Sequence, residues 1–403
     1  MPDVAFEIPA AQRTRTFNYA IRNIVANAKA LEAKGRTVRY LNIGDPLLYD
    51  FHTPAELVDA VVKAMRDNKN GYAPSLGIPS AREAVARYMA GRGVPTDPSD
   101  VILASGASEA ADLFLTACIE PGDEVLTPVP SYPLYSAILS KLGAAEKRYR
   151  LHAEQGWAPD PESIDRLCTP RTKAIVLIHP NNPTGSVYTE AQLESILKVC
   201  ERRRLILLAD EVYAELAFQG ATRALASMAG DRVPVLTLDS FSKTFLVPGW
   251  RVGWMTFSHH AAFGKEIRAA VQKLAEGRLC SAGPVQHAVP VGLDGPKAHL
   301  GDTVGRFRRQ TELASRRLNA MPGVSCVPAG GAFYLMPRVP LRKGETDDKF
   351  VLSFLEATGN LVVHGSGFNL GPEEGYFRLV TLHSERELGL VLDDLEAFLK
   401  ARA

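Results

Sequence analysis

Three side chains in the middle of the sequence could together bind an aromatic aldehyde. Lys243 lies in SFSKTFLVPGWRVGW, framed by hydroxyl and aromatic residues and followed by a Pro-Gly turn and Arg251. Upstream, the apolar run LILLA ends in Asp210, and Tyr213 follows. Apolar surroundings and a second cation lower the pKa of a lysine, so its free amine can form a Schiff base. We expect Lys243 to form this bond with an aldehyde whose ring nitrogen needs a counter-charge.

Pyridoxal 5′-phosphate is the aldehyde that suits these residues. Asp210 would favour the protonated ring nitrogen, while Tyr213 and Asn182 can donate hydrogen bonds to the phenolate oxygen. After a substrate amine displaces it, Lys243 can move the proton at the substrate Cα as general base and acid. Each residue also has an ordinary interpretation, because Asp210 could cap a helix and the NNPTG segment around Asn182 could be a simple turn.

A phosphate group needs backbone N–H groups and a cation. The segment SGASEA, which starts at Ser105, follows a predicted strand and opens a helix, so its amides and the Ser108 hydroxyl can hold an anion. Ser240 and the bidentate guanidinium of Arg251 supply further donors. Tyr132, between two prolines, offers an aromatic face for stacking on the ring. A partial capping box from Ser105 to Ser108 and an aromatic core position for Tyr132 are the alternatives.

Composition favours small-molecule partners. The 403 residues are 46% hydrophobic, and 46 basic against 45 acidic residues give a net charge of +1. Such a balance excludes a polybasic surface for nucleic acid or anionic membrane. The five cysteines are odd in number and scattered, which indicates reduced thiols, and the nine histidines show no metal-site spacing. Without a signal peptide or a spanning segment, the chain is expected to be soluble and cytoplasmic.

The order of the predicted elements indicates an α/β fold. Seven short β-rich runs alternate with helix-like segments, and they start at residues 101, 124, 146, 174, 205, 235 and 252. This alternation predicts a mostly parallel seven-stranded sheet wrapped by helices. In such sheets ligands bind beyond the carboxyl ends of the strands, where Ser105, Asn182, Asp210 and Ser240 fall. We expect a large domain over 52–295, a smaller α+β domain over 296–403, and an N-terminal segment, 1–51, that packs with the small domain.

From about Tyr19 to the C-terminus, the sequence resembles the class I and II aminotransferases of the fold-type-I pyridoxal phosphate superfamily, and within them the alanine (glutamate–pyruvate) aminotransferase group. The motifs that carry the resemblance are YAIRNIVANAKALEAKG, LNIGDP, GYAPSLG, HPNNPTGSVY, ADEVY, SFSKTFLVPGWRVGW and RLCSAGPVQHA.

The resemblance implies a role for each matching residue. Lys243 would bind the cofactor aldehyde, Asp210 the ring nitrogen, and Asn182 with Tyr213 the phenolate oxygen, while Tyr132 would stack on the ring. The phosphate would be bound by Ala107, Ser108, Ser240 and Arg251. Tyr72 would reach the phosphate of a neighbouring subunit, which implies a homodimer with shared active sites. Arg378 would clamp the substrate α-carboxylate, and Gly44 would line the same pocket.

The implied reaction is a ping-pong transamination between an L-amino acid and a 2-oxo acid, with alanine/pyruvate and glutamate/2-oxoglutarate as the favoured pairs. An aspartate or broad-specificity aminotransferase and a fold-type-I C–S lyase are the alternatives. A pocket that accepts both a methyl group and a distal carboxylate needs a mobile arginine. Arg22, with Tyr19 beside it, is the favoured candidate for this role, and Arg278 is the other.

Overall fold

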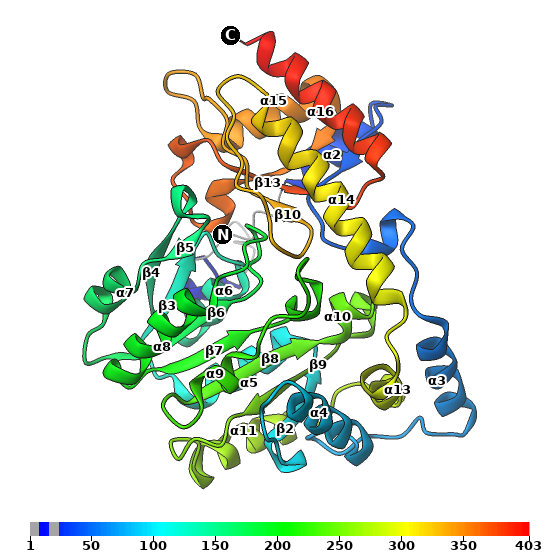
Figure 1. Cartoon of the computed structure of the whole chain (residues 1–403), viewed down its shortest axis with the longest axis vertical. Coiled ribbons are helices and arrows are strands. Elements are labelled where there is room, and N and C mark those ends of the chain that lie inside the picture. Colours follow the sequence, from blue (N-terminus) through cyan, green and yellow to red (C-terminus); the bar gives the residue numbers. More distant parts are fainter. Residues whose placement is uncertain (1–7, 16–23, 403) are drawn as a thin grey trace, which may run out of the picture.

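The structure, a computed structural model, describes residues 8–15 and 24–402, and its centre is one large sheet (Figure 1). The strand order in this sheet is β2-β9-β8-β7-β6-β3-β4-β5. The strands are β2 (Val101–Ser105), β3 (Glu124–Val129), β4 (Ala145–His152), β5 (Ala158–Pro159), β6 (Thr172–Ile178), β7 (Ile206–Asp210), β8 (Val235–Ser240) and β9 (Val252–Phe257). All seven predicted strands are confirmed, and the two-residue β5 is an addition at the edge that the sequence did not predict.

Strand direction brings the site residues to one edge of the sheet. β4, β3, β6, β7 and β8 pair in parallel, whereas β9 runs antiparallel to both β8 and β2. In the register, Gly253 of β9 lies opposite Ser240, and Val252 lies opposite Ser105. The start of β9, which follows Arg251 directly, therefore lies beside the carboxyl ends of β2 and β8.

Helices cover both faces of the sheet because its central strands are apolar on both sides. In β6, Ile175 and Leu177 belong to one hydrophobic cluster, and Val176 and Ile178 belong to the other. This alternation is what a period of two residues requires. One face packs against α5 (Ala107–Cys118), α6 (Leu134–Leu142) and α11 (Lys265–Gly277), and the other against α4 (Pro79–Gly91), α8 (Glu190–Arg203), α9 (Leu225–Ala229) and α13 (Ala288–Asp294).

A second group of elements lies above the large sheet in Figure 1. It contains the antiparallel sheet β10-β13-β12, whose strands are Tyr334–Leu335, Phe377–Val380 and Val363–His364. Helices α14 (His299–Asn319), α15 (Asp347–Thr358) and α16 (Glu385–Lys400) pack around it. The long α14 connects this group to the large sheet.

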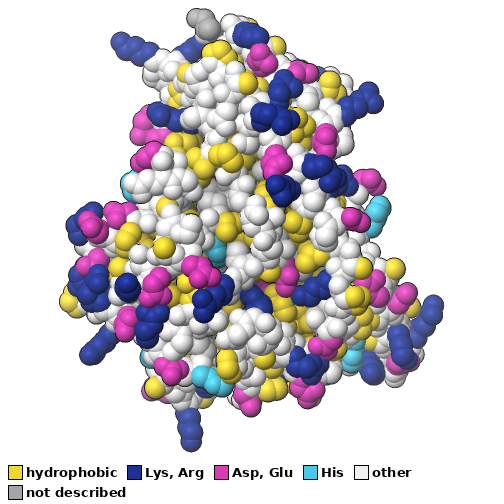
Figure 2. Space-filling view, viewed as in Figure 1, with side chains coloured by type: hydrophobic (Ala, Val, Ile, Leu, Met, Phe, Trp, Pro, Cys, Tyr) yellow, Lys and Arg dark blue, Asp and Glu magenta, His cyan; other side chains and the backbone are white. Residues whose placement is uncertain are grey.

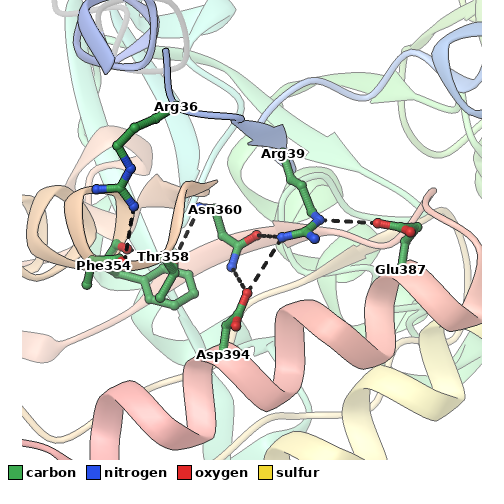
Figure 3. A network of polar contacts seen from close by, with 8 residues as sticks. Arg36, Arg39, Phe354, Thr358, Asn360, Glu387 and Asp394 are labelled. Carbon is green, nitrogen blue, oxygen red and sulfur yellow. Dashed lines mark hydrogen bonds and ion pairs between the residues drawn. The ribbon is translucent and has the colours of Figure 1, made fainter. Parts of the chain in front are cut away.

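Residues of the N-terminal segment contact this second group. β1 (Arg39–Tyr40) pairs in parallel with β11 (Asn360–Leu361). Figure 3 shows Arg39 between two carboxylates of α16, with its Nε 3.2 Å from Glu387 and its Nη1 3.6 Å from Asp394. Asn360 donates to the same Asp394 at 2.8 Å. The domain boundaries at residues 51 and 295 remain a prediction, with which these contacts agree.

On the face shown in Figure 2, acidic and basic side chains are interspersed. Of the helices in the described ranges, none has the length and apolar character that crossing a bilayer requires. Within residues 8–15 and 24–402, no group of three or more His, Cys, Asp or Glu side chains could hold a metal ion.

Candidate active site

A cavity of about 520 Å³ opens at the edge of the sheet where the site residues were expected. Eleven of the residues singled out from the sequence line it: Gly44, Ala107, Ser108, Tyr132, Asn182, Asp210, Tyr213, Ser240, Lys243, Arg251 and Arg378. Tyr72 does not line it, and its side chain is 84% exposed. Tyr19 and Arg22 lie outside the described residues.

Lys243 lies on α10 (Phe241–Thr244), the short helix that follows β8 directly. Ser240, at the end of β8, caps this helix by accepting a hydrogen bond from the Ser242 amide at 3.3 Å. The Lys243 Nζ donates to the Gly44 carbonyl. Desolvation lowers the pKa of Lys243 to about 8, with a contribution from the nearby guanidinium groups of Arg378 and Arg251. A substantial fraction of this lysine is therefore a neutral, nucleophilic amine at mildly alkaline pH.

Asp210 ends β7 and is buried. Its Oδ2 accepts a hydrogen bond from the Tyr135 hydroxyl at 2.7 Å. Burial raises the pKa of Asp210 to about 6, although the hydrogen bond from Tyr135 acts in the opposite direction. A buried carboxylate of this kind gains stability from a cation beside it, so Asp210 can bind a protonated ring nitrogen.

The turn from β2 into α5 forms the anion-binding end of the cavity. The helix is capped by Gly106, at a φ of 82°, with no side-chain hydrogen bond, so the Ser105 to Ser108 capping box is not formed. A Cβ at Gly253 would lie 2.4 Å from the Ala107 nitrogen, which shows how closely β9 approaches this helix start. Arg251 donates from Nη2 to the Ser105 carbonyl at 2.9 Å.

These groups have the character of a phosphate site. The amides at the start of α5 carry the positive end of the helix dipole, and the guanidinium of Arg251 adds a full charge. Ser108, Ser240 and Ser242, each of which carries a hydroxyl group, line the same cavity.

Arg378 is a buried arginine, although an arginine on a strand is commonly a surface residue. It lies on β13, is 2% exposed, and donates to Asn182 Oδ1 at 3.1 Å and to the Asn42 carbonyl. Its guanidinium lies 4.8 Å from each of the rings of Tyr334 and Phe368. These contacts fix its orientation at the cavity wall, where it can bind a carboxylate.

Two tyrosines at the site were not assigned roles from the sequence. Tyr135 binds Asp210, as described above. Tyr334 on β10 lies with its hydroxyl 2.8 Å from that of Tyr213. A Cβ at Gly44 would lie 2.3 Å from the Tyr334 hydroxyl, so any larger residue there would force the ring of Tyr334 or Phe333 to move. Tyr334 and Tyr213 lie far apart in the sequence, so no local pattern indicated that they are partners.

The residues present fit pyridoxal 5′-phosphate. The cavity combines a phosphate-type anion site, a buried carboxylate for the ring nitrogen, and a lysine with a lowered pKa for the aldehyde. Tyr213 and Asn182 can donate to the phenolate oxygen, and Tyr132 offers a ring face.

Comparison with known proteins agrees with the cofactor that the cavity residues fit. A family model described as aminotransferase class I and II matches residues 37–395. Alanine aminotransferase of Mycobacterium tuberculosis is 38% identical over 94% of the chain and 90% of that protein. Glutamate-pyruvate aminotransferase of Escherichia coli is 34% identical over 94% and 95%. The solved structure of alanine aminotransferase from Pyrococcus furiosus has a TM-score of 0.94 at 36% identity and covers 98% of this chain and 100% of that one.

Proposed function

The chain belongs to the class I and II aminotransferases, and we propose that it transfers amino groups between alanine/pyruvate and glutamate/2-oxoglutarate. It is a pyridoxal-phosphate-dependent enzyme. The bound cofactor supplies an electron sink for the negative charge that develops at the substrate Cα. One observation carries the proposal: a lysine of lowered pKa, a buried carboxylate and a buried arginine line one cavity.

Lys243 is proposed to hold the cofactor and then to act on the substrate. Its neutral amine is available because its pKa is lowered to about 8. When the substrate amine has taken its place, the same nitrogen can remove the proton from the substrate Cα and later return it. Asp210 would keep a proton on the ring nitrogen, and Tyr213 and Asn182 would donate hydrogen bonds to the phenolate oxygen.

The remaining residues bind and orient. The phosphate is proposed to lie at the start of α5, held by Ala107, Ser108, Ser240 and Arg251, with Tyr132 stacked on the ring. Arg378 is proposed to bind the α-carboxylate as a bidentate fork, and Gly44 to line the substrate pocket. Such a fork fixes the orientation of the substrate, which a single charge would not do.

The names of the relatives favour the alanine and glutamate pairs over aspartate. Glutamate has a distal carboxylate that alanine lacks, and Arg22, beside Tyr19 in YAIRNI, is proposed as its partner. We expect Arg22→Ala to weaken glutamate binding by roughly 1.5–3 kcal/mol, the value of a charged hydrogen-bonded contact. Alanine binding, measured in the same titration, serves as the control and should hardly change. Equal losses for the two amino acids would remove Arg22 from this role.

A homodimer with shared sites is part of the proposal. Tyr72 is 84% exposed, and other large apolar side chains are exposed as well, among them Leu48, Met65 and Leu279. An interface with a second copy of the chain would cover side chains of this kind. We also propose a cytoplasmic location, because all five cysteines are free thiols.

The experiment is a panel of single half-reactions. Purified holoenzyme is mixed with alanine, glutamate, aspartate, valine or tyrosine, and the cofactor absorbance is followed. Alanine and glutamate should convert the cofactor fastest, and a 2-oxo acid should restore the spectrum. Lys243→Ala, loaded with cofactor, is the control and should convert none of them. Release of pyruvate and ammonia without an acceptor would indicate a C–S lyase instead, and an unchanged spectrum with all five would reject the proposal.

A further inference from the structure

Arg278 lies against the free edge of β2, outside the cavity. β2 is the first strand in the order of the large sheet, so within residues 8–15 and 24–402 one of its edges has no neighbouring strand. At this edge the Leu103 amide donates to the Leu76 carbonyl at 2.9 Å. The Leu103 carbonyl accepts from Arg278 Nη2 at 2.7 Å. The guanidinium is thus bound to the strand that leads into the anion-binding turn.

Arg278 also forms an ion pair with Glu109. Its Nε lies 3.2 Å from Glu109 Oε2, and the Arg278 side chain is only 15% exposed. An ion pair that is largely withdrawn from water is less screened than a surface pair. Arg278 is therefore held in place by two groups of this subunit.

Glu109 connects this pair to the anion-binding turn. It is the third residue of α5, and its Oε2 accepts a hydrogen bond from the Ser105 amide at 2.7 Å. A glutamate at this position commonly reaches back to an amide before the helix. On the other side of the same residue, the Ser105 carbonyl accepts from Arg251. The backbone of Ser105 is thus fixed by Glu109 and Arg251 together.

The charges add a second effect. Glu109 places a negative charge in the first turn of α5, close to the amides of Ala107 and Ser108 that line the cavity. Such a charge stabilises the helix start but repels an anion bound there. Arg278 neutralises it without entering the cavity.

We infer that Arg278 is a positioning residue for the phosphate end of the cofactor, acting through Glu109 on the β2–α5 turn, and that it does not bind the distal carboxylate of the substrate. The inference rests on the proposed function, since it takes the anion at this turn to be the cofactor phosphate. It also separates the two arginines that the sequence left open for glutamate recognition.

The test measures cofactor affinity in the full-length apoenzyme. We expect Arg278→Met to weaken pyridoxal phosphate binding about tenfold, because it frees the turn and exposes the Glu109 charge to the phosphate. Glu109→Gln keeps an acceptor for the Ser105 amide and removes the negative charge, so its effect should stay below about threefold. The double variant should bind the cofactor more tightly than Arg278→Met alone, because the repelling charge is gone.

Two probes show where the effect acts. Pyridoxal, which lacks the phosphate, should bind Arg278→Met and wild type within about twofold of each other, while inorganic phosphate should lose affinity as the cofactor does. Arg232→Met is the matched control. Like Arg278, Arg232 pairs with a glutamate, Glu194, but both residues are far from Arg278 in the sequence and Arg232 does not line the cavity. It should leave cofactor affinity unchanged.

The opposite pattern would overturn the inference. If Arg278→Met keeps wild-type cofactor affinity and raises the KM of glutamate but not of alanine, Arg278 is the substrate arginine. Should that variant fail to fold, Arg278→Lys retains a cation beside Glu109 but loses the fork that reaches Leu103. Arg278→Lys should lower the affinity for the cofactor at least twofold, and an unchanged affinity would count against the inference. Wild-type protein that binds no pyridoxal phosphate would instead reject the proposed function.

Discussion

At the scale of single residues, the site depends on groups whose protonation differs from that in water. Asp210 is the clearest case, because burial raises its pKa from 3.8 to about 6. A carboxyl group with a raised pKa contributes stability below its unfolded pKa, and this contribution is lost as the pH rises through the folded value. Above about pH 6, the ionised Asp210 therefore destabilises the protein that lacks cofactor, and this is the cost of the counter-charge that we propose Asp210 to supply to the ring nitrogen.

Asp210→Asn tests this trade-off between stability and binding. Without cofactor at pH 8, the variant should be more stable than wild type by roughly 2–3 kcal/mol, the value of a shift of about two pKa units. Near pH 4 the difference should disappear, because Asp210 is then protonated. Thermal and urea unfolding of the apoenzyme at both pH values measures this difference in stability. Asp231→Asn, at an exposed position, is the control. A variant less stable than wild type at pH 8 would contradict the assignment.

Tyr334→Phe tests the pair of phenols. Burial raises the pKa of Tyr213 well above its usual range, so both hydroxyls stay protonated and one donates to the other. Removing the Tyr334 hydroxyl should cost about 1 kcal/mol of transition-state stabilisation, which lowers kcat/KM about fivefold. The ring should still pack on Arg378. Tyr376→Phe is the control, because Tyr376 directly precedes β13 and does not line the cavity. Steady-state kinetics of both variants decides, and equal effects would remove the hydroxyl pair from the mechanism.

At the scale of elements, the anion site depends on β9 lying directly against the start of α5. Gly253 makes this possible, because any side chain there would displace the Ala107 amide. The antiparallel direction of β9 also brings this strand to the anion site. The chain leaves β8, passes Lys243 and Arg251, and enters β9 at the same edge of the sheet where β8 ends. Lysine and arginine thus come from one connection between neighbouring strands.

Gly253→Ala tests this contact. The added Cβ would meet backbone atoms at 2.4 Å, so we expect a loss of about 1–3 kcal/mol in stability, typical of overpacking, and weaker cofactor binding. Gly249→Ala is the matched control, since no atom of the described residues lies within 4 Å of its added Cβ. Denaturant unfolding and cofactor titration of the two variants give the comparison. Equal behaviour would show that α5 can move without consequence.

The sequence predicted those features that depend on neighbours along the chain. The strands follow from apolar, β-branched runs, and Asp210 and Lys243 follow from their place at strand ends. It could not predict β5, because two residues with a proline give no strand signal. Nor could it predict that Tyr334 binds Tyr213, 121 residues away, or that Tyr135 binds Asp210, 75 residues away. Those partners are set by how separate elements pack.

At the scale of the whole molecule, the proposed dimer makes a site that neither subunit completes. Mixing two defective variants tests this. Lys243→Ala should be inactive, and Tyr72→Ala should bind cofactor weakly. In a hybrid dimer, one site would combine the intact Lys243 of one subunit with the intact Tyr72 of the other. Co-refolding the two variants should therefore restore activity towards half that of the wild type in the hybrid. Activity no higher than that of Tyr72→Ala would show that each subunit uses its own tyrosine.

β2 is the border strand of the large sheet, so the turn that follows it lies at the margin of the sheet. A phosphate held at the margin of a sheet can be reached from outside the subunit, whereas one at a central strand is enclosed by its own chain. If a second copy supplies Tyr72 at this turn, loss of the partner subunit also weakens cofactor binding. When the holoenzyme is diluted until its subunits separate, it should then release its cofactor. The fraction of cofactor that stays bound would therefore depend on the protein concentration.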